Sequence, residues 1–213
     1  MNCKRILSAL LLCAVLLCCT GCGEEAEIYT HEDLVFGTIE TTNTTCTYTS
    51  VTGIACTLDP QWKLVVGDQL NDLTGTIVNM DDPVSVSRAL NLGRPVYELY
   101  ALGNTGASLS VSVEDMRVIL GEPVSAEAYG QCIEKPSRQR LQILGVQNLE
   151  LTLGTVDFAG AQHPAILTTG DLMNAKFYET HVFLTQGNYV YTVTVTCYNK
   201  DIRTETLAYF TAV

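Results

Sequence analysis

Apolar and polar residues alternate over long stretches in the second half of the chain, which is typical of β-strands. Residues 108–113 alternate between serine and a branched apolar residue, so one face of this strand is expected to be buried. Glycine-containing turns at 103–106 and 186–188 each separate two runs of this kind. We therefore expect two antiparallel hairpins, over residues 94–113 and 176–198.

Shorter runs indicate the remaining elements. Asp82 followed by Pro83 is typical of a helix start, because the carboxylate accepts from early amides and proline lacks a donor that would have no partner there. Pro136 predicts an interruption of the helical region 125–144. The order of elements predicts an α+β domain, a mostly antiparallel sheet with helices packed on it. The other expected strands are 35–39, 44–50, 53–58, 148–158 and 164–169, and the expected helices are 67–73, 83–90, 125–132, 137–144 and 201–210.

The first residues are typical of a secretory signal. Two basic residues at 4–5 precede an apolar run, 6–19, which is shorter than the ~20 residues of a spanning helix. The end of this segment resembles a bacterial lipobox, in which small residues precede a cysteine that receives lipid, although Cys19 stands where leucine is usual. The resemblance predicts a lipoprotein signal peptide over 1–21 and lipidation of Cys22; an ordinary cleaved signal or an uncleaved anchor are the alternatives.

Composition and charge set limits on partners. The 213 residues carry a formal net charge of −11, and removal of residues 1–21 takes away Lys4 and Arg5 but no acid, which leaves −13. Such a charge argues against nucleic acid as a partner. We expect an acidic, solvated tether over 22–33 and one domain over 34–213. Two acyl chains on Cys22, such as palmitate, suffice for stable anchoring on the extracytoplasmic face of the cell membrane.

Four cysteines remain after the predicted signal and lipid site, namely Cys46, Cys56, Cys132 and Cys197. A hairpin folded about Val51 would place Cys46 opposite Cys56, so the sequence predicts a disulfide between them. Two buried free thiols are the alternative, and a redox or metal site lacks the usual CxxC spacing. The pairing of Cys132 and Cys197 stays open.

Several segments resemble the Mog1/PsbP-like family. Residues 53–62 (GIACTLDPQW) are similar to its opening motif of alternating apolar positions followed by PxxW, with Cys56 where phenylalanine is usual. Residues 155–165 resemble the hairpin after its middle helices, and 187–196 its closing strand. Secreted lipoproteins of Firmicutes bacteria share this layout. The resemblance implies an α-β-α sandwich, and it transfers no activity because a fold does not fix a function.

Candidate chemistry is sparse. Trp62, Tyr189 and Tyr191 could form a binding surface if exposed, but a position in the core is the favoured interpretation of all three. His31 falls in the predicted tether, and His163 and His181 on different strands. Spacings typical of hydrolases, metal sites and phosphate loops do not occur. We therefore expect no catalytic residue, no metal and no cofactor.

Together these observations favour a non-enzymatic, membrane-anchored binding or scaffolding module for another envelope protein. The alternative is an extracytoplasmic binder of a small ligand or metal ion, in a groove between sheet and helix. A hydrolase would need a Ser/His/Asp set that the spacing does not reveal.

Overall fold

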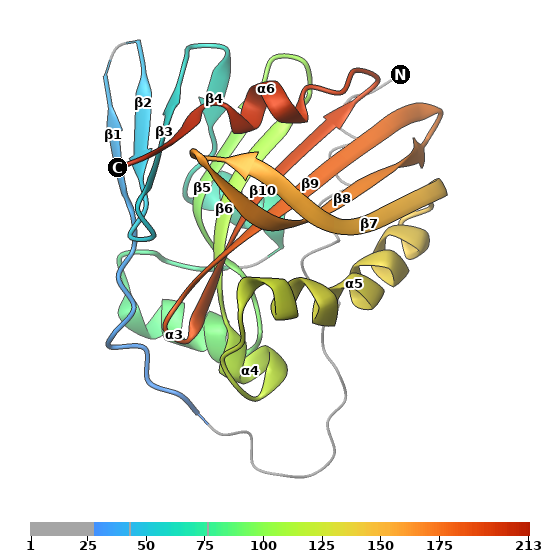
Figure 1. Ribbon diagram of the computed structural model, residues 1–213. Helices are drawn as coiled ribbons and strands as arrows, with labels where there is room; N and C mark the ends of the chain where they lie inside the picture. The colour runs from blue at the N-terminus through green and yellow to red at the C-terminus, as the bar shows by residue number, and fades with distance from the viewer. Residues whose placement is uncertain (1–27, 43, 76) are drawn as a thin grey trace.

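The computed structural model describes residues 28–42, 44–75 and 77–213, and the predicted signal peptide and Cys22 lie outside them. Figure 1 shows two sheets with helices around them. The strands are β1 (Thr38–Thr41), β2 (Cys46–Thr49), β3 (Ile54–Leu58), β4 (Trp62–Leu64), β5 (Val96–Gly103), β6 (Ser108–Asp115), β7 (Gln147–Phe158), β8 (Ala161–Leu172), β9 (Ala175–Gln186), β10 (Tyr189–Tyr198) and β11 (Phe210–Ala212). The helices are α2 (Asp68–Thr74), α3 (Pro83–Asn91), α4 (Met116–Leu120), α5 (Ala126–Ile143) and α6 (Arg203–Leu207).

The main sheet has the strand order β4-β5-β6-β10-β9-β8-β7, and the smaller sheet has the order β1-β2-β3-β11. Every pair of neighbouring strands is antiparallel. The hairpins expected at 94–113 and 176–198 are present as β5–β6 and β9–β10. The predicted α+β class, with a mostly antiparallel sheet, is confirmed.

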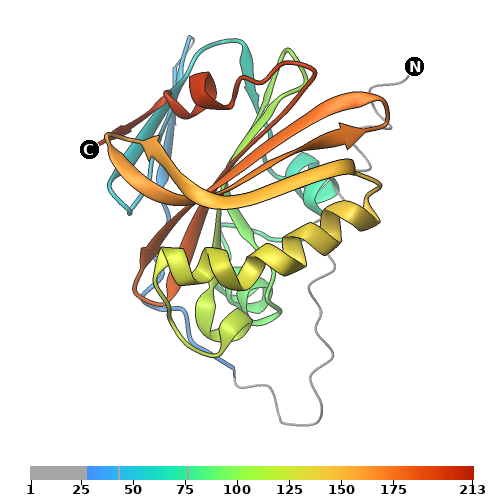
Figure 2. The same cartoon turned by 45° about the vertical axis from the view of Figure 1, so that its right-hand side comes forward.

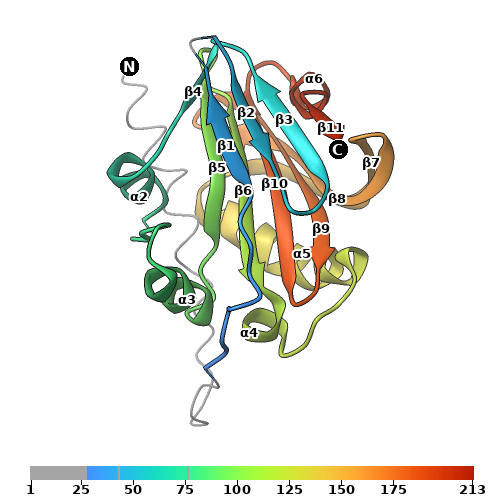
Figure 3. The same ribbon diagram turned by 90° about the vertical axis from the view of Figure 1, so that its left-hand side faces the viewer.

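The two faces of the main sheet have different coverings. On one face, Val111 and Val193 pack in a cluster with Tyr48 of the smaller sheet and Leu207 of α6. On the other face, Phe183 packs with Tyr129 and Leu141 of α5. Figure 3 shows the smaller sheet in front of the main sheet and α5 behind it, and Figure 2 shows α5 running along β7 and β8. Helices therefore lie on both faces, and the smaller sheet shares one of those layers. Among the described residues, no helix combines the length and apolar character needed to cross a membrane.

The helix starts follow the expected chemistry, but one helix is longer than predicted. The Asp82 side chain accepts from the Val84 amide at 3.0 Å, with Pro83 in the first turn. The expected break at Pro136 is wrong, because α5 runs without interruption from Ala126 to Ile143. Its apolar side, which includes Tyr129 and Leu141, is buried on the sheet. That burial outweighs the single hydrogen bond that a proline removes from a helix.

The end of the chain also differs from the prediction of a helix over 201–210. α6 stops at Leu207, and Phe210 begins β11, which pairs with β3 opposite Cys56. The Phe210 side chain is buried, with its ring centroid 5.0 Å from that of Phe158. Burying this aromatic ring between the two sheets contributes more than one further helical turn would.

The predicted disulfide is not formed, and the described cysteines are free thiols. The β2–β3 hairpin is centred on Thr52 rather than Val51, because Ser50 pairs with Ile54 across a three-residue turn that ends in Gly53 at φ +82°. Cys46 therefore lies opposite Leu58, and Cys56 lies opposite Tyr48. The two cysteine side chains lie on one face of the hairpin but in diagonal positions. Their Cα atoms are about 7–8 Å apart, which is beyond the reach of an unstrained disulfide.

Candidate functional site

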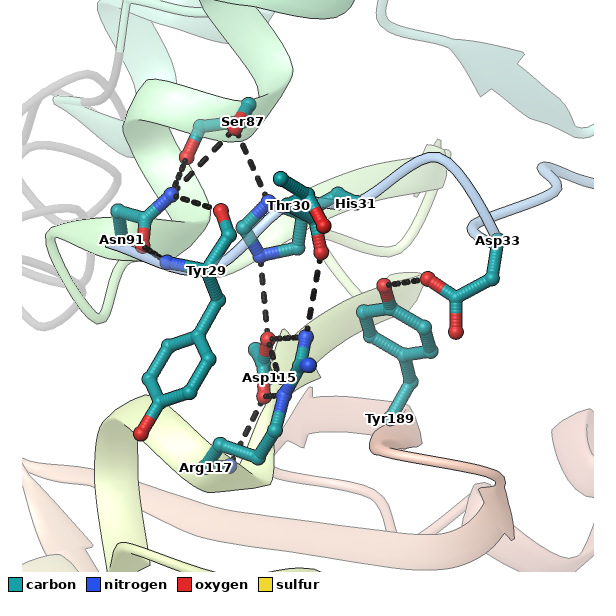
Figure 4. A network of polar contacts seen from close by, with 9 residues as sticks. All are labelled: Tyr29, Thr30, His31, Asp33, Ser87, Asn91, Asp115, Arg117 and Tyr189. Carbon is teal, nitrogen blue, oxygen red and sulfur yellow. Dashed lines mark hydrogen bonds and ion pairs between the residues drawn. The ribbon is translucent and has the colours of Figure 1, made fainter. Parts of the chain in front are cut away.

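Residues Tyr29–Val35, which we name the strap, lie against α3 and against the end of the main sheet where β6 leads into α4 (Figure 3). Most of them fall in the segment 22–33, for which the sequence predicts a solvated tether. Instead, the strap is held by side chains from α3, from the junction of β6 and α4, and from β10 (Figure 4). It brings an N-terminal segment into contact with the candidate binding residues.

His31 is the central side chain of the strap. Its Nδ1 atom lies 3.0 Å from Oγ of Ser87, and its Nε2 atom lies 3.1 Å from Oδ2 of Asp115. The His31 side chain is 3% exposed. Burial lowers the pKa of His31, although the charge of Asp115 and its hydrogen bond act in the opposite direction.

Asp115 is shared between the strap and α4. It accepts from the Arg117 backbone amide at 2.8 Å, which caps α4, and from the Arg117 guanidinium at 2.6 Å. Burial by itself raises the pKa of Asp115, but the bonds and charge of Arg117 outweigh it and the pKa is lowered. The Arg117 guanidinium also lies over the ring of Tyr29, 4.5 Å from its centroid.

Asn91 fixes the backbone of the strap. Its Oδ1 atom accepts from the Tyr29 amide at 2.9 Å, and its Nδ2 atom donates to the Tyr29 carbonyl at 3.0 Å. Nδ2 also donates to the Ser87 carbonyl at 2.9 Å. Because both backbone groups of Tyr29 are bonded to one side chain, the position of this residue relative to α3 is set independently of its own side chain.

Tyr189 and Tyr191 do not form an exposed aromatic patch. They are 3% and 2% exposed, respectively, and they lie beneath the strap. The Tyr189 hydroxyl donates to Oδ1 of Asp33 at 2.7 Å, and the Tyr191 hydroxyl lies 3.5 Å from the Val35 carbonyl (Figure 4). The binding surface expected from these tyrosines is therefore covered by a segment of the same chain.

Trp62 lies far from the strap, in β4. Its indole ring packs edge-on to Tyr209, with ring centroids 6.2 Å apart, and covers Gly103. Within the described part of the chain, its Nε1 atom has no hydrogen-bond partner. The structure thus separates Trp62 from Tyr189 and Tyr191, so the three residues do not make one surface.

An open groove lies next to the strap, between the β2–β3 turn and the ends of β8 and β9. It has a volume of about 400 Å³ and is lined by Val51, Thr52, Ala126, His163, Pro164 and residues 183–186. A smaller pocket of about 190 Å³ adjoins it under the strap and includes Asp33, Val35, Gly187, Tyr189 and Tyr191. Val51 and Gln186 line both, so the two spaces are neighbours.

The two strand histidines do not converge. Ile166 pairs with His181 and Ala165 pairs with Val182, which places His163 and His181 on opposite faces of the main sheet. The described residues contain no group of three or more His, Cys, Asp or Glu side chains arranged to hold a metal ion. His163 lies in the groove, edge-on to Phe158, and burial lowers its pKa.

A second polar cluster, which was not expected from the sequence, lies between α5 and the main sheet. His181 lies 2.8 Å from Oε1 of Glu179, and Arg140 of α5 lies 3.6 Å from the same oxygen. Burial on its own raises the pKa of Glu179, yet the charge of His181 and these contacts lower it to about 2. Glu114 accepts from the Tyr129 hydroxyl at 2.9 Å, and here burial dominates and raises the pKa of Glu114.

The sequence pattern that could have revealed this second cluster is the row of polar residues that alternates with apolar ones along the strands. Thr194 and Thr196 face α5 and bond to His181 and Glu179 at 3.0 and 3.1 Å. A polar row opposite a helix, in strands that are buried on both faces, indicates an internal hydrogen-bond network. The cluster is closed beneath α5, so we assign it to the interior of the fold and not to a binding site.

Comparison with known proteins gives similarities at the level of structure. No protein-family model and no curated protein matches the sequence. Nineteen solved chains match, among them the solution structure of cyanobacterial PsbP (CyanoP) from Synechocystis sp. PCC 6803, at 13% identity and a TM-score of 0.48, covering 81% of this chain and 95% of that one. LpqN, involved in cell envelope biogenesis of Mycobacterium tuberculosis, matches at 8% identity and a TM-score of 0.35, covering 73% of this chain and 75% of that one. Neither likeness carries information about function.

Proposed function

We propose that the protein is a lipid-anchored, extracytoplasmic binding module that holds another envelope protein in the groove beside the strap, without catalysis. The lipobox-like end of the signal segment supports the anchor at Cys22. The open groove of about 400 Å³ between the two sheets is the observation that carries the binding role.

The chemistry of the groove suits a polypeptide segment. Val51 and Pro164 provide apolar contacts, while Thr52, Thr185 and Gln186 provide hydroxyl and amide groups for a partner backbone. Protein interfaces combine an apolar centre with a polar rim in this way. A small-molecule site, in contrast, encloses most of its ligand, whereas this groove is largely open to solvent.

Site-specific photo-crosslinking tests the proposal in membranes of cells that express the full chain. A crosslinking amino acid at Gln186, which is exposed in the groove, is expected to give one reproducible protein adduct. The same residue at Asn104, in the exposed β5–β6 turn, is the matched control and should give none. Equal adducts from both positions, or none from either, would contradict binding at the groove.

The anchor is tested separately through Cys22. Replacing it by alanine is expected to move the chain from the membrane fraction to the soluble extracytoplasmic fraction and to abolish incorporation of labelled palmitate.

Binding of a small ligand is the second candidate function, and the adjoining pocket under the strap, with Asp33 and two tyrosines, is its candidate site. Thermal unfolding with calcium, zinc and common metabolites distinguishes this candidate, since a ligand of the folded state raises the melting temperature.

A further inference from the structure

The docked strap limits how far the domain can lie from its anchor. Cys22 and Tyr29 are seven residues apart, so an extended chain between them spans at most about 25 Å. Tyr29 is fixed on α3 by its two hydrogen bonds to Asn91. If the lipid on Cys22 is in the bilayer, as the proposed function requires, Tyr29 cannot lie farther than this from the membrane surface.

The main sheet places the opposite end of the domain about as far from the strap as the linker itself can reach. β6 runs from Ser108 to Asp115, and Asp115 contacts the strap, so the far end of this strand is about 24 Å from the strap at ~3.4 Å per residue. Figure 1 shows α3 and α4 at one end of the molecule, with the strap, and α6 at the other. The attachment point is therefore at one extreme end of the domain.

The surface around the attachment point suits the interfacial layer of a bilayer. Ile28 and Leu92 are 83% and 55% exposed, and they are the chain neighbours of the bonded pair Tyr29 and Asn91. Arg88, in the last turn of α3, is exposed as well. Side chains that combine an exposed apolar part with a guanidinium are favoured at the headgroup level.

We propose that the docked strap orients the domain on the membrane, with the α3–α4 end against the bilayer and Ile28, Leu92 and Arg88 in contact with the headgroups. This inference rests on the lipid anchor of the proposed function. The groove then opens close to the membrane, because Tyr189 of the adjoining pocket pairs with Asp115 in the main sheet. The partner of the groove would accordingly be the juxtamembrane segment of a membrane protein.

Fluorescence quenching on vesicles tests the orientation. The acylated full-length protein, with Cys132→Ser to remove the exposed thiol, is labelled at Glu122→Cys beside α4 or at Asn104→Cys at the far end. The vesicles contain a phosphatidylcholine with a spin label on its headgroup. We expect strong quenching at 122 and none at 104.

Release of the strap is the second arm. The double change His31→Ala and Asn91→Ala removes its main contacts and is expected to abolish the difference between the two positions. Asn148→Ala, which removes a comparable exposed amide bond on β7, should preserve the difference. Equal quenching at 122 and 104 in the parent protein overturns the inference, as does a difference that survives release of the strap.

Flotation of the same vesicles separates the two proposals. A chain that carries no lipid does not float, and the anchor and the orientation then fail together. A chain that floats but shows equal quenching retains its anchor and overturns only the orientation.

Discussion

Nε2 of His31 lies 3.1 Å from Oδ2 of Asp115, although 84 residues separate the two along the chain. The contact joins the strap to the end of β6. The titratable and charged groups that face the imidazole are Asp115, Asp33, Arg117 and Tyr189. Burial lowers the pKa of His31, and the two carboxylates offset this only in part.

Docking of the strap is therefore expected to weaken in acid. A histidine whose pKa is lowered in the docked state binds a proton more readily when released. Its contribution to docking is therefore fully present above the ordinary pKa of about 6.5 and decreases as the pH falls below that value. Hydrogen-exchange protection of residues 29–35 should drop between pH 7 and 5. His31→Gln, which keeps hydrogen-bonding groups but does not titrate, should show no such drop; an equal drop in this variant would contradict the assignment to His31.

The carboxylates beneath α5 are expected to differ in their effect on stability. Glu179→Gln leaves Arg140 and His181 without their shared charge and should cost about 3–5 kcal/mol of unfolding free energy at pH 7. Glu114→Gln should cost about 1 kcal/mol or less, because the amide oxygen still accepts from Tyr129. Urea unfolding of both variants measures the difference, and similar costs would contradict it.

Glu179 also makes the stability of the protein sensitive to acid. The pKa of Glu179 is lowered to about 2 in the fold, so the stability it contributes is present above the ordinary glutamate pKa of about 4.3 and is lost as the pH falls toward 2. The parent protein should lose stability over this range more steeply than Glu179→Gln. Parallel losses in the two proteins would remove Glu179 as the cause.

Thiol labelling distinguishes the structure from the disulfide expected from the sequence. Cys132 is exposed and should react rapidly with iodoacetamide in the native protein. Burial raises the pKa of Cys56 to about 12, so this thiol should react only after unfolding. Without reductant, denatured protein should be alkylated at Cys46, Cys56, Cys132 and Cys197. Peptide mapping that finds Cys46 and Cys56 unlabelled would show a bond between them.

Two glycines on neighbouring strands offer a matched test of packing. A Cβ atom on Gly170 would lie 2.6 Å from Cγ1 of Val146 and 3.0 Å from the Gln147 carbonyl oxygen, so Gly170→Ala should destabilise by about 1–3 kcal/mol. On Gly154 the nearest atom would be Cδ1 of Leu167 at 3.6 Å, an ordinary contact. Gly154→Ala should change stability by less than about 1 kcal/mol, and a larger loss at Gly154 than at Gly170 would contradict the geometry.

Local signals predicted the parts of the fold that depend on neighbouring residues. The turn at 103–106 has glycine at both ends, and the β5–β6 hairpin occurs as expected. At the start of α3, Asp82 supplies a side-chain acceptor and Pro83 has no amide donor that needs a partner, and this helix start occurs as expected too. The β2–β3 hairpin was predicted too, but its register depends on the turn conformation at Gly53, which the sequence does not specify. The pairing of Cys46 followed from that register and was wrong.

The remaining parts depend on contacts between distant segments. Phe210 leaves the helical pattern to pack on Phe158, and α5 continues through Pro136 because the sheet covers its apolar side. The strap is polar, so its sequence alone predicts a solvated segment. Its docking depends on Ser87, Asn91 and Asp115, which only the fold brings together. No local pattern spans the 56 to 84 residues that separate these groups along the chain.

β11 has a consequence for the timing of folding. It completes the smaller sheet by pairing Phe210 with Cys56, so that sheet cannot close until residues 210–212 have been synthesised. Contacts of such long range form late, because the intervening loop must first be ordered. If the chain is exported as the proposed function requires, this delay would keep the precursor unfolded during passage and postpone final assembly to the far side of the membrane.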